Sequence, residues 1–282
     1  MNDPSHPEPD NRADTGIYER IEQVTAYLRR FDGVLVAFSG GVDSSTLAAL
    51  AYMALGDRSA AVTAQSQTLP KRELESAGKT AKSIGIKHFV IHYNELDEPG
   101  FASNPVDRCF HCKTGLFRAL KVLANESGFE AVADGTNASE LTGHRPGHKA
   151  ALEQNILTPF ADMGITKDEI RQIARLLGLD IWDKPQQACL SSRFPYGHSI
   201  TIDGLEQVEQ AEDMLFALGI EQCRVRHHDD TARIEVPERF FEIVLKNKET
   251  LITLFKSLGY TYITLDIEGF RSGSFDISPN QD

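Results

Sequence analysis

The feature of this sequence that most constrains its fold is an apolar run that breaks at two glycines and resumes with helical spacing. The run is VLVA at residues 34–37, and it is followed by FSGGVDSSTLAAL at residues 38–50. We predict a buried strand over 34–38 and a helix over 43–56. Glycines at such a junction let backbone amides turn toward a ligand at the positive end of the helix. The stretch therefore predicts an oxyanion or phosphate site at the end of a strand.

The loop carries hydroxyl groups but lacks the lysine of the common nucleotide-binding loop. The string SGGVDSS after a buried strand resembles the PP-loop of ATP pyrophosphatases, which hold the β,γ-pyrophosphate of ATP while the α-phosphate is attacked. The resemblance implies activation by AMP transfer, with Asp43 helping to hold Mg²⁺. The alternatives are an ordinary βα turn and an acid favoured by the helix dipole. The expected residues for ATP and pyrophosphate are Ser39, Gly40, Gly41, Val42, Asp43, Ser44 and Ser45.

Strands and helices alternate along most of the chain. Strands are expected at 60–65, 88–93 and 131–133, and helices at 71–85, 113–127 and 166–178. Thr166 and Glu169 match a capping box at the start of the last helix. This alternation predicts an α/β fold with a Rossmann-like parallel sheet, whose ligands bind beyond the carboxyl ends of the strands.

The last part of the chain follows a different pattern. We expect a helix at 203–218, a hairpin of strands at 221–228 and 231–236, helices within 238–258 and a strand at 260–267. The predicted organisation is a disordered, proline-containing tail (1–16), a PP-loop domain (17–196) and a smaller α+β domain for substrate binding or oligomerisation (197–282).

Composition excludes several classes of protein. No apolar stretch approaches the roughly 20 residues that cross a bilayer, and the first residues lack an apolar signal core, so we expect a cytoplasmic protein. The net charge of −12 argues against binding to a nucleic-acid backbone but allows a small anionic substrate in a local basic pocket. Four cysteines in 282 residues are too few for a disulfide scaffold.

Three cysteines have a spacing suited to a metal. Cys109 and Cys112 are separated by two residues in DRCFHCK, in an expected connection between elements, and Cys189 lies in an expected loop. Such a set suits a [4Fe–4S] cluster with one open iron, or a zinc site completed by water, His or Cys223. Unrelated structural thiols are the alternative. Strand alternation makes Cys223 a core residue rather than a ligand.

Seven motifs lie along the chain from about Ile17 almost to the last residue: AFSGGVDSS, DRCFHCKTGLF, ADGTN, RPGHKAA, WDKPQQACLSSRFPYG, CRVRHHDDTARIE and DIEGFRSGS. Together and in this order they resemble the LarE family of ATP-dependent sulfur transferases of nickel-pincer nucleotide synthesis. The resemblance implies that the carboxylates of a pyridinium-dicarboxylate mononucleotide are adenylated and converted to thiocarboxylates. It adds Gly135 of ADGTN to the ATP-binding set.

The family uses two sulfur sources. In some members one cysteine, matching Cys189, gives up its own sulfur, whereas others hold a [4Fe–4S] cluster with three cysteines. The extra pair in this chain favours the cluster, held by Cys109, Cys112 and Cys189. The resemblance also implies a homo-oligomer, a hexamer in the family, and leaves the sulfur donor unknown.

The C-terminal part adds charged candidates. Glu212 lies on the helical stripe of Leu205, Val208 and Leu215, either at the edge of the buried face or aimed into a site. The resemblance implies the second, so Cys189, Asp43 and Glu212 are the expected catalytic residues. Arg224 and Arg226 share a strand face, which is either solvated or a site for the substrate phosphate with Arg193.

Three other functions account for part of the sequence. A tRNA thiolase also combines a PP-loop with cysteines but needs an RNA-binding surface, which the charge does not supply. An amidating synthetase explains the loop and leaves the three cysteines idle. A non-enzymatic nucleotide-binding protein would bind ATP without releasing pyrophosphate.

Overall fold

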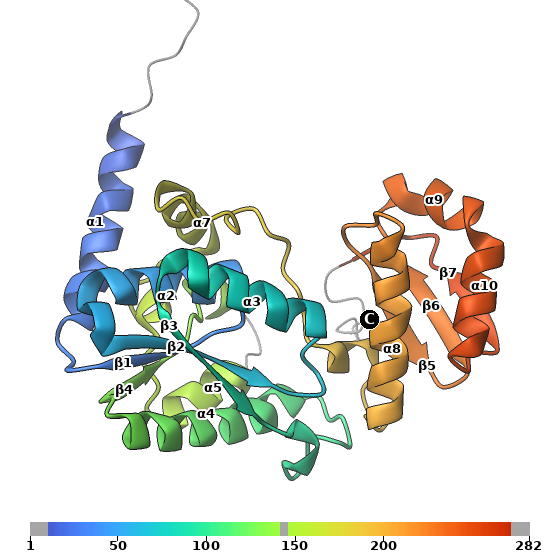
Figure 1. Cartoon of the computed structure of the whole chain (residues 1–282), viewed down its shortest axis with the longest axis horizontal. Coiled ribbons are helices and arrows are strands. Elements are labelled where there is room, and N and C mark those ends of the chain that lie inside the picture. The colour runs from blue at the N-terminus through green and yellow to red at the C-terminus, as the bar shows by residue number, and fades with distance from the viewer. Residues whose placement is uncertain (1–10, 142–145, 272–282) are drawn as a thin grey trace, which may run out of the picture. The chain divides into compact units, whose positions relative to one another are not determined.

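The computed structural model of the chain describes residues 11–141 and 146–271 (Figure 1). It divides into two compact units that interleave along the sequence. The first unit comprises the described residues up to Thr63, 74–91 and 117–184, and the second comprises 64–73, 92–116 and the described residues from Pro185 onward. The sequence suggests instead one boundary near residue 196.

The first unit is built on a four-stranded parallel sheet, as predicted. The strands are β1 (Val34–Ala37), β2 (Ser59–Gln65), β3 (Lys87–His92) and β4 (Ala131–Ala133), in the order β3-β2-β1-β4. β1 runs parallel to both neighbours, with Val36 opposite Ala61 and Ala133. The strand order reverses between β1 and β4, which is where open α/β sheets bind their ligands.

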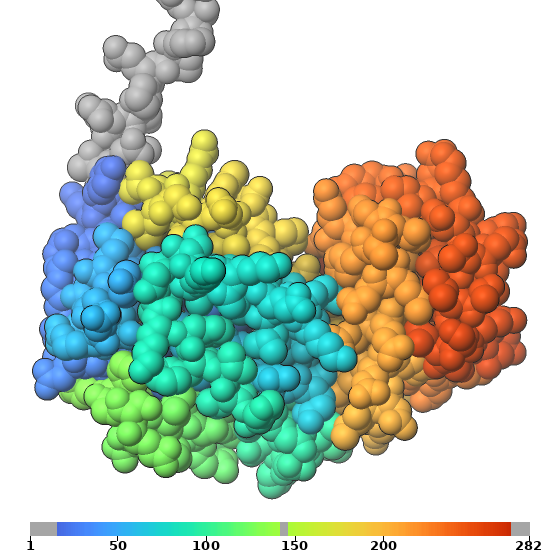
Figure 2. Space-filling view, in the orientation of Figure 1, coloured from blue at the N-terminus to red at the C-terminus, as the bar shows by residue number. Residues whose placement is uncertain are grey.

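Helices before, between and after these strands supply the core; of the elements named next, the turn at 95–97 and residues 108–116 belong to the second unit. They are α1 (Asn11–Leu28), α2 (Val42–Leu55), α3 (Lys71–Ile84), α4 (Arg108–Ser127), α5 (Pro146–Glu153), α6 (Pro159–Asp162) and α7 (Lys167–Leu176), with 3₁₀ turns at Gly56–Arg58, Glu95–Asp97 and Ala138–Leu141. Leu47 and Leu50 of α2 and Ile173 of α7 are fully buried. α3 buries only Ala77 and Ala81, and the teal residues around it lie at the front of the face that Figure 2 shows.

Two predictions about helix ends have clear outcomes. The capping box of α7 is present, with the Thr166 hydroxyl and the Glu169 carboxylate each accepting from the other's backbone amide. α1, however, begins at Asn11, so residues 11–16 are helical where a disordered tail is expected. The tail residues 1–10 lie outside the described part of the chain.

The second unit contains the predicted smaller sheet. Its elements are the 3₁₀ turn Leu190–Arg193, α8 (Ile202–Ala217), β5 (Arg224–His228), β6 (Thr231–Glu235), the 3₁₀ turn Glu238–Phe240, α9 (Phe241–Lys246), α10 (Lys248–Ser257) and β7 (Tyr262–Leu265). β6 pairs antiparallel with β5 and parallel with β7. Leu215, Val225 and Phe255 form part of its buried core. None of the helices in the described residues is long and apolar enough to cross a membrane.

Candidate functional site

The glycine loop lies at the carboxyl end of β1, at the point where the strand order reverses. Gly41 is the N-cap of α2, and Gly40 adopts φ of 72°, a conformation that favours glycine. A Cβ atom at Gly40 would lie 2.8 Å from the Cα of Ala77. A side chain here would displace the loop, so both the turn and its packing require glycine.

The hydroxyl groups of the loop form a small local network. Ser39 Oγ lies 3.1 Å from Ser44 Oγ, and the amide of Gly41 donates weakly to Ser39 Oγ at 3.4 Å. Ser45 is fully buried, and its Oγ has no hydrogen-bond partner among the described residues. With the first amides of α2, these groups provide donors for an oxyanion.

Gly135 comes directly after β4 and packs against this loop. A Cβ atom on Gly135 would lie 2.9 Å from the amide nitrogen of Ser44, so only glycine allows this approach. Two residues later, the Asn137 side-chain amide donates to Asp43 Oδ1 at 3.2 Å. The two strands on either side of the reversal therefore bring their loops together.

Two lysines next to the loop are absent from the expected site residues. The Lys167 amine pairs with Asp43 Oδ2, and the Lys184 amine contacts the Gly40 carbonyl at 3.4 Å and Ser76 Oγ at 3.1 Å. Both lysines are far from the glycine loop in the sequence. Lys184 belongs to the motif WDKP, which is the sequence signal that could have identified it as a site residue. They place positive charge where the loop lacks its own lysine.

Cys109 lies in the first turn of α4 and Cys112 at the start of the second, whereas the sequence suggests a connection and a helix starting at residue 113. The helix starts earlier because the segment before it is held by tertiary contacts. Asn104 donates to the carbonyls of Phe194 and Pro195 and accepts from the buried Arg108 guanidinium. The two cysteines are thus three positions apart on one helical face.

The third cysteine lies in the same unit. Cys189 is exposed and forms the N-cap of the 3₁₀ turn Leu190–Arg193. Loss of surrounding water raises the pKa of the Cys109 thiol, and Cys189 raises it further. Burial also raises the pKa of Cys112 well above its usual value, with contributions from Glu95, Cys189 and Cys109. The three thiols are therefore within electrostatic reach of one another.

These thiols supply the donor type and number that a three-cysteine cluster needs. A bound metal would favour the thiolate forms that the unliganded surroundings disfavour. No group of three His, Cys, Asp or Glu side chains among the described residues is already arranged to hold a metal ion. The donor set fits a cluster, and its assembly would have to bring the three sulfurs together.

Glu95 lies beside this group and was not expected from the sequence. Its Oε1 accepts from Ser66 Oγ at 2.9 Å and from Thr68 Oγ1 at 2.7 Å. Its Oε2 is buried without a hydrogen-bond partner among the described residues, and burial raises its pKa. Glu95 is thus a buried acid that acts electrostatically on Cys112.

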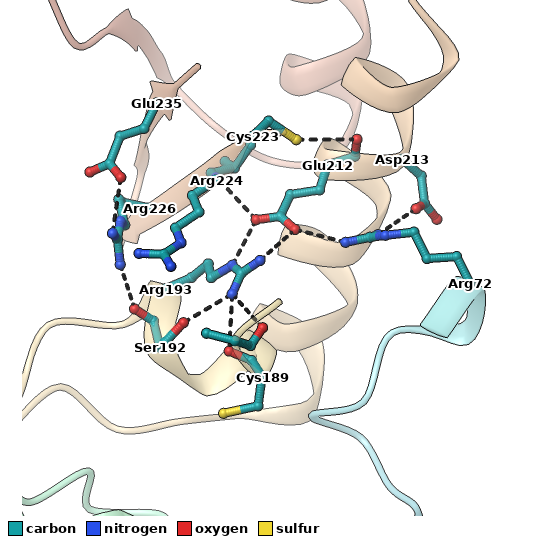
Figure 3. A network of polar contacts seen from close by, with 12 residues as sticks. Arg72, Cys189, Ser192, Arg193, Glu212, Asp213, Cys223, Arg224, Arg226 and Glu235 are labelled. Carbon is teal, nitrogen blue, oxygen red and sulfur yellow. Dashed lines mark hydrogen bonds and ion pairs between the residues drawn. The ribbon is translucent and has the colours of Figure 1, made fainter. Parts of the chain in front are cut away.

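Glu212 is fully buried in an ion-pair network (Figure 3). Arg193 donates to both of its oxygens, at 2.7 and 2.9 Å, and Arg72 donates to Oε2 at 3.1 Å. Burial alone would raise the pKa of Glu212, but the two arginines and the Val225 amide hold it below its usual value. Glu212 is therefore an ionised, paired carboxylate.

The arginines of β5 differ from one another in their partners. Arg226 is buried, donates to the Ser192 carbonyl at 2.7 Å and pairs with Glu235 at 2.9 Å. Arg224 makes no ion pair with a described residue, and its guanidinium lies 4.8 Å from the centre of the Phe270 ring. Burial, together with nearby Arg226 and Arg193, lowers the pKa of Arg224 to about 10.

This arrangement favours an anion at Arg224, because a buried cation that makes no ion pair with a described residue is stabilised by a bound phosphate. The residues expected to bind the substrate phosphate were Arg193, Arg224 and Arg226. In the structure Arg193 pairs with Glu212, and Arg226 pairs with Glu235. Cys223 is only 2% exposed, which confirms it as a core residue.

The chain is similar in sequence to one protein family and to several known proteins. Residues 17–103 match the family described as NAD synthase. An uncharacterized protein of Synechocystis is 42% identical over 91% of this chain and 97% of its own length. The pyridinium-3,5-bisthiocarboxylic acid mononucleotide synthase of Lactiplantibacillus plantarum is 35% identical over 89% of this chain and 91% of its own. The tRNA-specific 2-thiouridylase MnmA of Rickettsia massiliae is 30% identical over 54% of this chain and 52% of its own.

Proposed function

Since the chain belongs to the family of the pyridinium-3,5-bisthiocarboxylic acid mononucleotide synthases, we propose that it is an ATP-dependent sulfur transferase acting on a pyridinium-3,5-dicarboxylate mononucleotide. The observation that carries the proposal is the glycine loop at the strand-order reversal, in a chain that also holds three thiols within electrostatic reach of one another. The loop suits ATP activation, and the thiols suit sulfur delivery.

The proposed reaction has two chemical steps for each carboxylate. A carboxylate oxygen attacks the α-phosphorus of ATP, which forms an acyl adenylate and releases pyrophosphate. A sulfur nucleophile then attacks the carboxyl carbon, and AMP leaves with the bonding electrons of the carbon–oxygen bond. Because AMP is a good leaving group, the carboxylate becomes reactive toward sulfur.

Residues of the first unit bind the nucleotide in this proposal. The amides of Gly40, Gly41 and Val42, with the hydroxyls of Ser39, Ser44 and Ser45, hold the departing pyrophosphate, and Gly135 keeps the loop closely packed. Lys184 and Lys167 add positive charge beside it. Asp43 would hold Mg²⁺, which would balance the phosphate charge.

Residues of the second unit handle the other substrates. Arg224 and Arg226 bind the 5′-phosphate of the mononucleotide, with Arg224 as the principal cation because it has no carboxylate partner among the described residues. Cys109, Cys112 and Cys189 would hold a [4Fe–4S] cluster, which would supply the transferred sulfide. The alternative within the same function is donation of the sulfur atom of Cys189 itself.

Thiolation of tRNA is the second candidate function. It is favoured only by the similarity to MnmA, which covers about half of this chain. The net charge of −12 argues against an RNA partner. A cytoplasmic location and assembly as a homo-oligomer remain predictions.

The direct test uses anaerobically purified protein with ATP, Mg²⁺, a sulfide source and the dicarboxylate mononucleotide. We expect release of AMP and pyrophosphate that depends on the mononucleotide, and a product in which oxygen is replaced by sulfur, detected by mass spectrometry. Activity with unmodified tRNA and none with the mononucleotide would contradict the proposal.

A further inference from the structure

Arg193 is fixed inside the second unit by contacts on all three of its nitrogens. It is 1% exposed. Nε and Nη2 donate to the two carboxylate oxygens of Glu212, at 2.7 and 2.9 Å. Nη1 donates to the carbonyls of Ala188 and Cys189, at 2.7 and 3.1 Å, and to Ser192 Oγ at 2.9 Å. One guanidinium therefore joins a helix carboxylate to the backbone on both sides of the Cys189 α-carbon.

The acceptor capacity of Glu212 is used within the protein. Oε1 accepts from Arg193 and from the Val225 amide at 3.0 Å, and Oε2 accepts from Arg193 and Arg72. Two oxygens offer about four acceptor positions, so no position remains for a metal ion. With Arg193 neutralised by this carboxylate, the guanidinium is also a poor site for a substrate phosphate.

The backbone that Arg193 contacts carries an exposed thiol. The Ser192 amide donates to the Cys189 carbonyl at 3.0 Å, and the Leu190 amide donates to the Thr68 carbonyl at 2.9 Å. Figure 3 shows the Cys189 sulfur pointing away from the guanidinium that holds its carbonyl. The sulfur is exposed and lies 2.9 Å from Ser191 Oγ, so the thiol is accessible while its backbone is held from inside.

We propose that Glu212 and Arg193 are a positioning pair, which fixes the turn at Cys189 so that its sulfur keeps one orientation during sulfur transfer. The effect of the pair on activity rests on the proposed function. The positioning role replaces the catalytic role expected for Glu212 and the phosphate-binding role expected for Arg193. The pair acts through the carbonyls of Ala188 and Cys189 and touches no substrate.

Three substitutions test the pair, and one serves as a control. Arg193→Lys keeps the charge, but a single amine does not bridge a carboxylate and two carbonyls. Glu212→Gln removes the charge and leaves a buried guanidinium without its partner. Glu212→Asp keeps the charge and withdraws the oxygens by one methylene, which provides a variant if Glu212→Gln does not fold. Arg72→Gln removes the other guanidinium from Glu212 and leaves both contacts to Arg193.

The first measurement is hydrogen exchange of the segment around Cys189 in the protein without substrates. We expect faster exchange of the Leu190 and Ser192 amides in Arg193→Lys and Glu212→Asp, and wild-type exchange in Arg72→Gln. The second measurement is steady-state sulfur transfer. A misplaced sulfur should lower kcat by about 100-fold, with KM for ATP and for the mononucleotide within about twofold of the wild-type values.

Other results would overturn the proposal. Wild-type exchange around Cys189 in all Arg193 and Glu212 variants would mean that the pair does not hold the turn. A raised KM for the mononucleotide with unchanged kcat would assign Arg193 to phosphate binding. Loss of Mn²⁺ binding in Glu212→Gln would assign Glu212 to a metal. Hydrogen exchange is measured without substrates and does not depend on enzymatic activity. A failure of the proposed sulfur-transfer function can therefore be distinguished from a failure of the positioning role.

Discussion

The amine of Lys167 pairs with the carboxylate of Asp43, although 124 positions separate the two residues. Asn137 donates to the other oxygen of the same carboxylate. Asp43 is therefore held in place at the start of α2, next to the glycine loop. A carboxylate fixed there is suited to binding Mg²⁺ with the phosphates of ATP.

We predict that Asp43→Ala abolishes pyrophosphate release and leaves the fold intact, because Asp43 lies on the first turn of α2 outside the apolar core. Pyrophosphate release and circular dichroism provide the two measurements. Asp57→Asn, an exposed acid just beyond the other end of α2, is the matched control and should retain activity. Unchanged AMP formation in Asp43→Ala would remove the catalytic assignment.

Arg224→Ala should weaken binding of the mononucleotide far more than binding of ATP. The lost group is a buried cation without a carboxylate partner among the described residues, and such a charge-assisted contact contributes about 1.5–3 kcal/mol. Isothermal titration with each ligand measures the difference. Arg239→Ala, which removes an exposed arginine paired with Glu221, is the control. Equal weakening of both ligands would argue against a separate phosphate site.

Cys109→Ser, Cys112→Ser and Cys189→Ser should each lower bound iron and sulfur transfer together after anaerobic reconstitution, because each thiolate is one part of a shared coordination shell. Cys223→Ser is the comparison, since that buried thiol lies in the C-terminal core. Iron analysis and product formation are measured on the same samples. Dehydroalanine at position 189 after one turnover, with the Cys109 and Cys112 variants still active, would establish the sacrificial mechanism instead.

His88 should make stability depend on pH. Burial lowers the pKa of His88, and its Nε2 lies 2.8 Å from Thr63 Oγ1. The folded state therefore favours the neutral ring, whereas the unfolded chain takes up a proton below about pH 6.5. The contribution of neutral His88 to the free energy of unfolding is therefore present above that pH. It is lost on acidification, because the unfolded state then binds more protons than the folded state.

The test is the thermal midpoint from about pH 7.5 to about pH 5.5, across the ordinary histidine pKa. We expect a smaller fall for His88→Gln than for the wild type. His227 and His228, whose pKa values are also lowered by burial, should preserve part of the dependence. His92→Gln, at an exposed position on the same strand, should behave like the wild type. An unchanged dependence in His88→Gln would contradict the prediction.

Much of the fold could be predicted because its signals act over short distances. The glycines at 40 and 41 require a turn after the apolar strand, and the Thr166 and Glu169 pair closes the first turn of α7. Strand alternation placed Cys223 in the core. The start of α4 was missed because Arg108 and Asn104 stabilise it through contacts with residues about 90 positions away.

The sequence by itself determined the local elements, the parallel α/β class and the identity of the reactive groups, since propensity, caps and periodicity depend on near neighbours. Only the tertiary structure decided which charges meet. It placed Lys167 on Asp43, Lys184 beside Gly40, and Glu212 on Arg193, while Arg224 was left without a carboxylate among the described residues. The strength of a charge pair depends on separation and on exclusion of water, and folding sets both quantities for residues far apart in the chain.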